Sequence, residues 1–222
     1  MARVLGLQQL LQKKYDYITL PSEIEESFGR LVENFLMIVW GNSGNGKSSF
    51  LMQFIKPLMD ADFGKGLYVS LEEGFEASIQ ANVLRHLSDD YLGKIEFADY
   101  EMTYEKLCDK LSKRKSPKFI IIDSLQYWNI NYDKYKALKE KFPRKTFIFI
   151  SHADGQNPSG TTAKQIRYDV PVKVRVEGYV AFVVSRFGGN KPFVIWEAGA
   201  KKHWGDKYNT IIKGVSEKKL KK

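Results

Sequence analysis

Cysteine is nearly absent from this sequence, since Cys108 is the only one in 222 residues. One thiol cannot form a disulfide within the chain, and it cannot supply the several cysteines of a typical structural zinc site. We therefore expect no zinc. A chain so poor in cysteine is typical of a reducing, intracellular compartment.

Long apolar runs are missing as well. No apolar stretch approaches the roughly 20 residues that cross a bilayer, and the first residues, Met1 to Val4, do not open the apolar stretch of a secretory signal. We therefore expect no membrane contact. Internal repeats and low-complexity linkers are absent too, and the length suits one sizeable hydrophobic core better than two.

Acidic residues are too few to balance the basic ones. The chain has 26 Asp and Glu against 35 Lys and Arg, which gives a formal net charge of +9. Such an excess favours polyanionic partners such as nucleic acid. Part of it lies in a terminal lysine cluster, however, and such clusters are usually solvated chain ends. The cluster consists of Lys213, Lys218, Lys219, Lys221 and Lys222.

What the sequence does contain is an alternation of short apolar segments with longer amphipathic ones, starting at about residue 35. This alternation predicts a mostly parallel β-sheet flanked by helices on both faces. The predicted strands are 35–40, 66–71, 94–97, 118–123 and 146–151, and the predicted helices are 47–59, 75–88, 103–115 and 132–141.

The pattern changes after residue 151. Residues 153–165 are rich in Gly, Asn, Ser and Thr, which predicts a long polar loop. Closely spaced apolar segments follow at 170–176, 178–185 and 192–197, and they predict antiparallel strands. The expected fold class is therefore α/β, with a C-terminal antiparallel β extension in the same domain.

Two shorter segments flank this core, which we place at residues 28–205. Residues 206–222 are predicted to form a basic tail. In segment 1–27, apolar residues recur at helical spacing, which predicts a helix that packs on the core or on a neighbouring subunit. These residues are Val4, Leu5, Leu7, Leu10 and Leu11.

A glycine-rich octet follows the first predicted strand. Residues 41–48 read Gly-Asn-Ser-Gly-Asn-Gly-Lys-Ser, which fits the pattern G-x-x-x-x-G-K-[ST]. The glycines let successive backbone N–H groups point at phosphate oxygens, and the following helix adds its N-terminal dipole. Lys47 supplies a positive charge toward the β- and γ-phosphates, and the Ser48 hydroxyl ligates Mg²⁺. The predicted ATP-binding residues are Gly41, Asn42, Ser43, Gly44, Asn45, Gly46, Lys47, Ser48 and Ser49.

Acidic residues end two of the later strands. Asp123 follows a buried strand and can hold Mg²⁺ through a water molecule. Glu72 and Glu73 come at the carboxyl end of segment 66–71, where ligands bind in open α/β sheets. A carboxylate there can orient and deprotonate water opposite the γ-phosphate. Acids at a helix N-terminus are also favoured by the helix dipole alone, so these residues leave both interpretations open.

Taken together, these segments resemble the RecA-like ATPase superfamily, in the branch that contains RadA/Sms recombination proteins, DnaB-type helicases and KaiC-like ATPases. The resemblance covers about residues 28–200. Besides the octet, it rests on Ser70-Leu71-Glu72-Glu73, Ile122-Asp123-Ser124-Leu125-Gln126, Ser151-His152 and Ser185-Arg186-Phe187-Gly188.

The resemblance implies roles for single residues. Glu72 matches the family's catalytic glutamate, with Glu73 as the fallback. His152 matches a residue that senses the γ-phosphate, although an ordinary loop histidine is the alternative. Arg186 is implied to act in trans, at a neighbouring subunit's ATP site, where its planar charged fork suits the transferred phosphoryl group. Val184 stands where the family has a second cation, which leaves the subunit coupling open.

In RecA-like rings, the loop after the sensor strand faces the central channel. The matching stretch here is 153–168, and its cations and aromatic ring suit contact with single-stranded DNA. A solvated surface loop is the alternative. The candidate DNA-binding residues are Lys164, Arg167, Tyr168, Lys173 and Arg175.

The sequence thus predicts a Mg²⁺-dependent ATPase that forms a hexameric ring or a filament and acts on DNA in recombination, repair or replication. The alternative is a KaiC-like regulatory or assembly ATPase without DNA contact. A nucleotide-binding subunit that never hydrolyses also stays open. A GTPase is disfavoured, because the sequence lacks an Asn/Thr-Lys-x-Asp guanine-reading motif. We expect a bacterial cytoplasmic location, for a cellular, phage or mobile-element protein.

Overall fold

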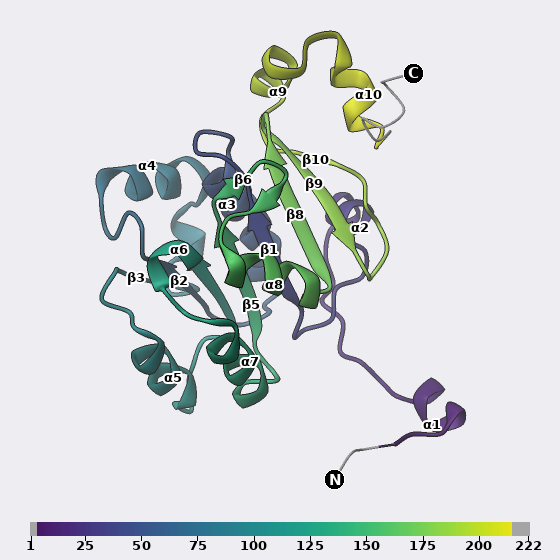
Figure 1. The fold of residues 1–222 in the computed structure, drawn as a ribbon, viewed down its shortest axis with the longest axis vertical. Coiled ribbons are helices and arrows are strands. Elements are labelled where there is room, and N and C mark those ends of the chain that lie inside the picture. The colour runs from purple at the N-terminus through teal and green to yellow at the C-terminus, as the bar shows by residue number, and fades with distance from the viewer. Residues whose placement is uncertain (1–3, 215–222) are drawn as a thin grey trace.

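The computed structural model describes residues 4–214 (Figure 1). The part of the predicted basic tail from residue 215 onward, with four of its five clustered lysines, lies outside the described residues.

One eight-stranded sheet forms the centre of the molecule, in the order β10-β9-β8-β1-β5-β4-β2-β3. The strands from β8 to β3 in this order run parallel, β9 is antiparallel to β8, and β10 is antiparallel to β9. The predicted α/β class with an antiparallel extension is therefore confirmed. The strands are β1 (Leu36–Trp40), β2 (Gly66–Ser70), β3 (Ile95–Ala98), β4 (Phe119–Asp123), β5 (Thr146–Ser151), β8 (Val172–Glu177), β9 (Val180–Ser185) and β10 (Phe193–Val194).

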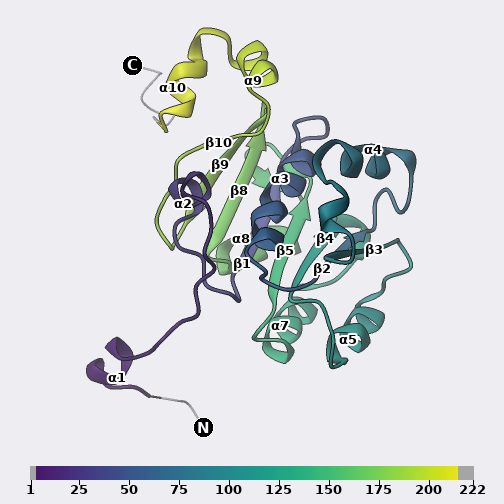
Figure 2. The same ribbon diagram turned by 180° about the vertical axis from the view of Figure 1, so that it is seen from behind.

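Helices cover both faces of this sheet, as Figures 1 and 2 show from opposite sides. Side chains alternate along a strand, so Met37 and Val39 of β1 enter one core and Ile38 and Trp40 enter the other. The first core includes α2 (Ser22–Phe28), α3 (Lys47–Asp60) and α4 (Ala77–His86). The second includes α5 (Tyr104–Ser112), α6 (Leu125–Trp128), α7 (Tyr132–Lys141) and α8 (Thr161–Asp169).

The prediction of a long polar loop at 153–165 was wrong. A short hairpin of β6 (Ala153–Asp154) and β7 (Asn157–Pro158) is followed by helix α8. Ala163 and Ile166, three residues apart on one helix face, are buried in the second core. Burial of this small apolar face outweighs the weak helix propensity of the surrounding glycine, serine and threonine.

The C-terminal prediction also needs correction. The strand expected at 192–197 shrinks to the two residues of β10, and the helices α9 (Glu197–Trp204) and α10 (Tyr208–Ile212) follow, joined by a short 3₁₀ turn. Tyr208 and Ile211 are buried in a small cluster with Val180 of β9. Residues 208–212 of the predicted basic tail are therefore helical.

The N-terminal segment has two parts. Residues such as Ile18 and Ile24 are buried in the first core, so the chain is already packed before residue 28. The predicted leucine-rich helix is present as α1 (Leu7–Leu11), but none of its residues is buried within the described chain. In both views it stands apart from the core (Figures 1 and 2). No helix among residues 4–214 has the length and apolar character to cross a membrane.

Candidate functional site

A cavity of about 340 Å³ lies at the carboxyl ends of the central strands. Its wall includes residues 43–49 except Asn45, and the acids Glu72, Glu73 and Asp123. The parallel sheet therefore brings together acids from β2 and β4 with the loop that follows β1, as the sequence predicted for this edge.

The octet turns tightly between β1 and α3. Gly44 and Gly46 have φ angles of +75° and +97°, which glycine adopts without strain. Gly41 is required for a different reason, because a Cβ atom there would lie 2.2 Å from the backbone oxygen of Val176 on β8. The loop thus packs against β8. The first residues of α3 line the cavity, and the first N–H groups of a helix have no partner within it.

Asn45 fixes this loop to the turn between β8 and β9. Its Oδ1 accepts a hydrogen bond from the backbone N–H of Gly178 at 2.7 Å, and its backbone oxygen accepts one from Tyr179 N–H at 3.3 Å. Its side-chain Nδ2 donates to the carbonyl oxygens of Asn42 and Ser43 at 3.4 and 3.3 Å. The Asn45 side chain, which was predicted to bind ATP, is thus bonded within the protein and does not line the cavity.

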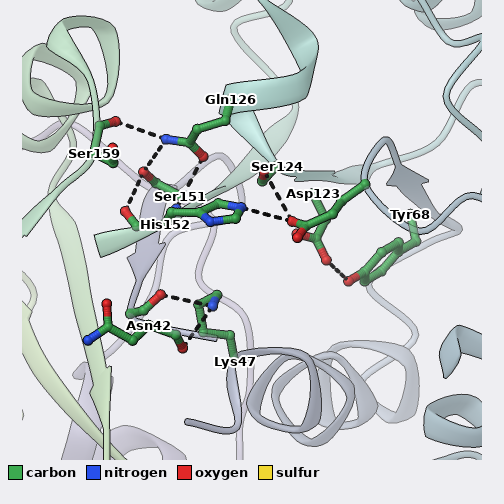
Figure 3. Close-up of polar contacts among 11 residues, drawn as sticks. Asn42, Lys47, Tyr68, Asp123, Ser124, Gln126, Ser151, His152 and Ser159 are labelled. Atoms are coloured by element: carbon green, nitrogen blue, oxygen red, sulfur yellow. Dashed lines mark hydrogen bonds and ion pairs between the residues drawn. The ribbon is translucent and has the colours of Figure 1, made fainter. Parts of the chain in front are cut away.

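Lys47 opens helix α3 and turns back over the loop (Figure 3). Its Nζ donates hydrogen bonds to the carbonyl oxygens of Gly41 and Asn42, at 2.9 and 3.1 Å. Burial lowers the pKa of Lys47, while the charges of Asp123 and Glu72 act to raise it. A cation held in a partly buried place is attracted strongly by anions that enter the same cavity.

Asp123 ends β4 beside the phenol of Tyr68 from β2. The Tyr68 hydroxyl donates to Asp123 Oδ2 at 2.5 Å (Figure 3). Burial raises the pKa of Asp123 to about 6, Glu72 adds to this, and the Tyr68 hydrogen bond and Lys47 oppose it. Among residues 4–214 there is no group of three or more His, Cys, Asp or Glu that could hold a metal by itself.

The side chains of Glu72 and His152 contact each other at the carboxyl ends of the parallel strands. Glu72 Oε2 lies 3.0 Å from His152 Nε2, and the Ser124 hydroxyl donates to the same oxygen at 3.5 Å. Gln126 connects this group to β5, because its Oε1 accepts from the His152 N–H at 3.1 Å and its Nε2 donates to Ser151 Oγ at 2.8 Å (Figure 3). The structure thus brings two predicted site residues together.

Glu73 points elsewhere. The hydroxyl of Ser78, near the start of α4, donates to Glu73 Oε2 at 2.5 Å. Both acids line the cavity, yet Glu72 alone has a histidine partner from β5 among the described residues. This arrangement favours Glu72 over Glu73 as the residue that handles a reacting group.

Several residues around this site could not be predicted from the sequence. A second cavity of about 430 Å³ adjoins the first, since Ser49, Arg85 and Tyr179 line both. The rings of Tyr179 and Trp196 lie 5.0 Å apart there in an edge-to-face arrangement, and Trp196 is 55% exposed. No motif marks these positions, because Tyr179 follows a turn glycine and Trp196 immediately precedes α9.

Arg186 lies far from this chain's own cavity. Strand β9 leads from Tyr179, whose ring is next to Gly46, to Ser185. At about 3.3 Å per residue, Arg186 is therefore roughly 20 Å from the octet. Its side chain is exposed. A direct action of Arg186 in its own cavity is thus excluded by the fold.

The five candidate DNA-binding residues lie on α8 and β8, not on a flexible loop. Lys164 pairs with Asp154 at 3.0 Å, and Arg175 pairs with Glu177. The Arg167 guanidinium lies over the rings of Trp40 and Tyr168. Burial lowers the pKa of Lys173, and the nearby Arg186 and Arg167 lower it further. Tyr168 is 72% exposed. Much of the charge of this group is therefore engaged within the chain.

Comparison with known proteins identifies a fold. No protein-family model and no curated protein matches the sequence. The flagellar accessory protein FlaH from Methanocaldococcus jannaschii is similar in structure, with a TM-score of 0.57, 16% identity, and coverage of 78% of this chain and 88% of that one. The KaiC-like protein PH0186 from Pyrococcus horikoshii OT3 has a TM-score of 0.57, 18% identity and the same coverage, 78% and 88%. The chain therefore has the RecA-like α/β fold that its sequence predicted.

Proposed function

We propose that the chain is a Mg²⁺-dependent ATPase, which converts ATP and water to ADP and phosphate. One observation supports this above all: a single cavity holds the glycine-rich loop, Lys47 and Asp123 beside a glutamate, Glu72, that contacts His152. Binding alone does not need that glutamate, whereas hydrolysis needs a base that can orient water.

The loop and its neighbours fit a nucleotide. Octet residues 41–48 offer N–H groups at the start of α3, and the absence of a Cβ at Gly41 lets the loop lie against β8. In this proposal Lys47 turns from the carbonyl oxygens of Gly41 and Asn42 to phosphate oxygens. The adenine ring lies in the adjoining cavity against Tyr179 and Trp196, since aromatic faces suit a planar base.

The metal site of this proposal uses few protein atoms. The Ser48 hydroxyl would bind Mg²⁺ directly and Asp123 would hold it through water, because Mg²⁺ keeps several waters and phosphate oxygens as ligands. Bound Mg²⁺ neutralises negative charge on the phosphates. The cation would also favour the ionised form of Asp123, whose pKa burial raises to about 6 in the protein alone.

Glu72 is the proposed base, and His152 and Ser124 hold its carboxylate in place. The test uses two isosteric variants, with Glu73→Gln as the matched control for Glu72→Gln. We expect Glu72→Gln to keep nucleotide affinity and to lose about 10²–10⁴-fold in turnover, the size of a general-base effect. A loss of turnover confined to Glu73→Gln would show that Glu73, and not Glu72, is the base. No loss in either variant would show that neither acid is the base, whereas no turnover in the parent chain would indicate a subunit that binds nucleotide without hydrolysing it.

Assembly into a ring or filament is part of this proposal. Arg186 lies roughly 20 Å from its own octet, so it can serve catalysis only at the cavity of another subunit. The predicted N-terminal segment 1–27 supports assembly too, because α1 has no buried residue within the described chain and exposes Leu7 and Leu11 at 74% and 76%. In this proposal α1 packs on the neighbouring subunit's core, taken as residues 28–205.

The process that ATP hydrolysis drives has two candidates. Action on DNA in recombination, repair or replication is supported by the net charge of +9. A KaiC-like regulatory or assembly role without DNA is supported by the two similar structures, a flagellar accessory protein and a KaiC-like protein. Steady-state ATP turnover with and without single-stranded DNA separates them, because only the first role predicts stimulation.

A further inference from the structure

A second concave surface lies at the opposite edge of the sheet from the nucleotide cavity. One cavity of about 540 Å³ lies between residues 13–17, 32–34 and Arg144. Another, of about 520 Å³, lies between the turns that precede β4 and β5. Lys118 and Arg144 line both, so the two form one continuous surface, which we term the amino-edge basin. Figure 1 shows α5 and α7, whose following turns contribute to this surface, at one end of the sheet.

The amino-edge basin is strongly basic, with eight of the chain's 35 lysine and arginine residues in its wall. Two acids, Asp16 and Glu33, also line it. Glu33 is engaged with Lys118 at 2.6 Å. The cavity between the turns has no acidic residue in its wall. A surplus of about six charges therefore lies here, out of the net charge of +9.

These cations are available to a partner. Lys113, Arg114 and Arg144 are exposed, and none has a carboxylate within 4.0 Å among the described residues. Lys145 plays a structural part beneath them, since its Nζ donates to the carbonyl oxygen of Pro117 at 2.5 Å. Burial lowers the pKa of Lys145, and the charges of Lys118 and Arg144 lower it further, as a positive local field requires.

Exposed aromatic rings lie in the same surface. Tyr15 and Tyr17 line the larger cavity and are 47% and 45% exposed. Lys13 Nζ lies 4.8 Å from the centre of the Tyr15 ring. An acidic peptide or an anionic membrane would need only the charge. The Arg30 guanidinium lies 4.7 Å from the centre of the Tyr17 ring, so each ring is about half exposed and has a cation over one face. Cations beside exposed aromatic rings are what a single strand needs, because its phosphates pair with the cations and its bases stack on the rings.

We propose that the amino-edge basin binds single-stranded nucleic acid, with phosphates on Lys113, Arg114 and Arg144 and bases stacked on Tyr15 and Tyr17. This surface is distinct from the candidates on α8 and β8, where Lys164 and Arg175 are already paired with acids. It is also separate from the nucleotide cavity, by the length of β4, which is roughly 16 Å. The inference deepens the DNA-acting form of the proposed function, but it does not require ATP turnover.

The test is a fluorescence-anisotropy titration of the full chain with labelled oligothymidylate and oligouridylate of about 20 nucleotides, over a series of salt concentrations. We expect the triple variant Lys113→Ala, Arg114→Ala, Arg144→Ala to lose at least about tenfold in affinity. Its salt slope should fall by about two, since each lost contact with a single strand removes ~0.7. Tyr15→Ala with Tyr17→Ala should lose about tenfold at an unchanged slope.

Two triple variants serve as controls. Lys106→Ala, Lys134→Ala, Lys201→Ala removes the same charge from surface ion pairs elsewhere and should change affinity little. Lys164→Ala, Arg167→Ala, Lys173→Ala tests the α8 surface, and a loss there with none in the basin variant would overturn the proposal. The single reversals Arg114→Glu and Arg144→Glu, at exposed positions, should act in the same direction as the basin triple variant.

Other partners give different results. Binding to phosphatidylcholine vesicles with phosphatidylserine, or to polyglutamate, without binding to either oligonucleotide would overturn the proposal. Preference for one oligonucleotide would decide between DNA and RNA. Lys47→Ala should retain oligonucleotide binding. Failure of the proposed ATPase function can therefore be distinguished from failure of the proposed nucleic-acid surface.

Discussion

Glu72 Oε2 and His152 Nε2 lie 3.0 Å apart, although 80 residues separate them in the chain. The contact joins the ends of β2 and β5, two strands with β4 between them in the sheet. Glu72 and His152 belong to two separate segments of the sequence, and the structure makes them one unit. Glu72 of this unit also interacts electrostatically with Lys47 and Asp123.

We predict that His152→Ala reduces ATP turnover about 10–100-fold, because Glu72 loses a hydrogen bond of the kind that contributes roughly 1.5–3 kcal/mol when one partner is charged. Nucleotide affinity should stay within about threefold. The measurement is steady-state turnover beside a binding titration. His152→Gln keeps a hydrogen-bonding group and should recover part of the rate. Equal loss of binding and turnover would contradict a role through Glu72.

A second prediction concerns Asp123 and pH. Burial raises its pKa to about 6, above the ordinary value of 3.8, so the folded chain holds this proton more tightly than the unfolded chain. Its contribution to stability is therefore present below about pH 4 and is lost as pH rises through 6. Asp123→Asn should raise the free energy of unfolding by up to about 3 kcal/mol above pH 6, because one pKa unit corresponds to ~1.4 kcal/mol.

The stability of Asp123→Asn should depend on pH and on the presence of Mg²⁺ and ATP. Thermal melts at pH 4 and pH 7.5 test the stability change, which should be small at the lower pH. Added Mg²⁺ and ATP should raise the melting temperature of the parent more than that of Asp123→Asn, because the amide cannot hold the cation's water shell as a carboxylate does. An unchanged melt at pH 7.5 would show that burial costs the carboxylate little.

The sequence predicted the central strands well for a physical reason. Strands such as β1 and β4 are buried on both faces, so they read as unbroken apolar runs. The octet follows β1 directly, and Asp123 is the last residue of β4. Helix α8 was missed because its buried face consists of little more than Ala163 and Ile166, within a stretch rich in residues that favour turns.

Contacts between distant segments were beyond sequence reasoning. Asn45 matches a variable position of the octet pattern, yet in the structure it is bonded to the β8–β9 turn. Tyr68 looks like an ordinary strand residue, yet its hydroxyl donates to Asp123. Such roles depend on sheet order, which periodicity does not encode. The amino-edge basin has the same origin, since its cations come from three separate turns and segments.

A third prediction concerns α1. Leu7→Ser, Leu10→Ser, Leu11→Ser should leave the thermal stability of the subunit unchanged within about 0.5 kcal/mol, because none of these side chains is buried in the described chain. Assembly should weaken, since the proposed neighbour loses an apolar contact. Light scattering with and without nucleotide measures the assembly. As a control, Ile24→Ser on α2 removes a buried side chain and should lower stability instead.

A last prediction places Arg186 and Glu72 on different subunits of one active site. Arg186→Ala alone should lose turnover and keep nucleotide affinity, as should Glu72→Gln. Mixing the two inactive variants should restore part of the activity. In mixed assemblies, some interfaces join an intact Glu72 from one subunit to an intact Arg186 from its neighbour.

The control mixture combines Lys47→Ala with a chain that carries both Glu72→Gln and Arg186→Ala. It provides no complete interface. Because β9 holds Arg186 at the end away from its own octet, recovery in the first mixture without recovery in the second is expected only for action in trans. Absence of recovery, in assemblies that light scattering shows to be mixed, would rule that role out.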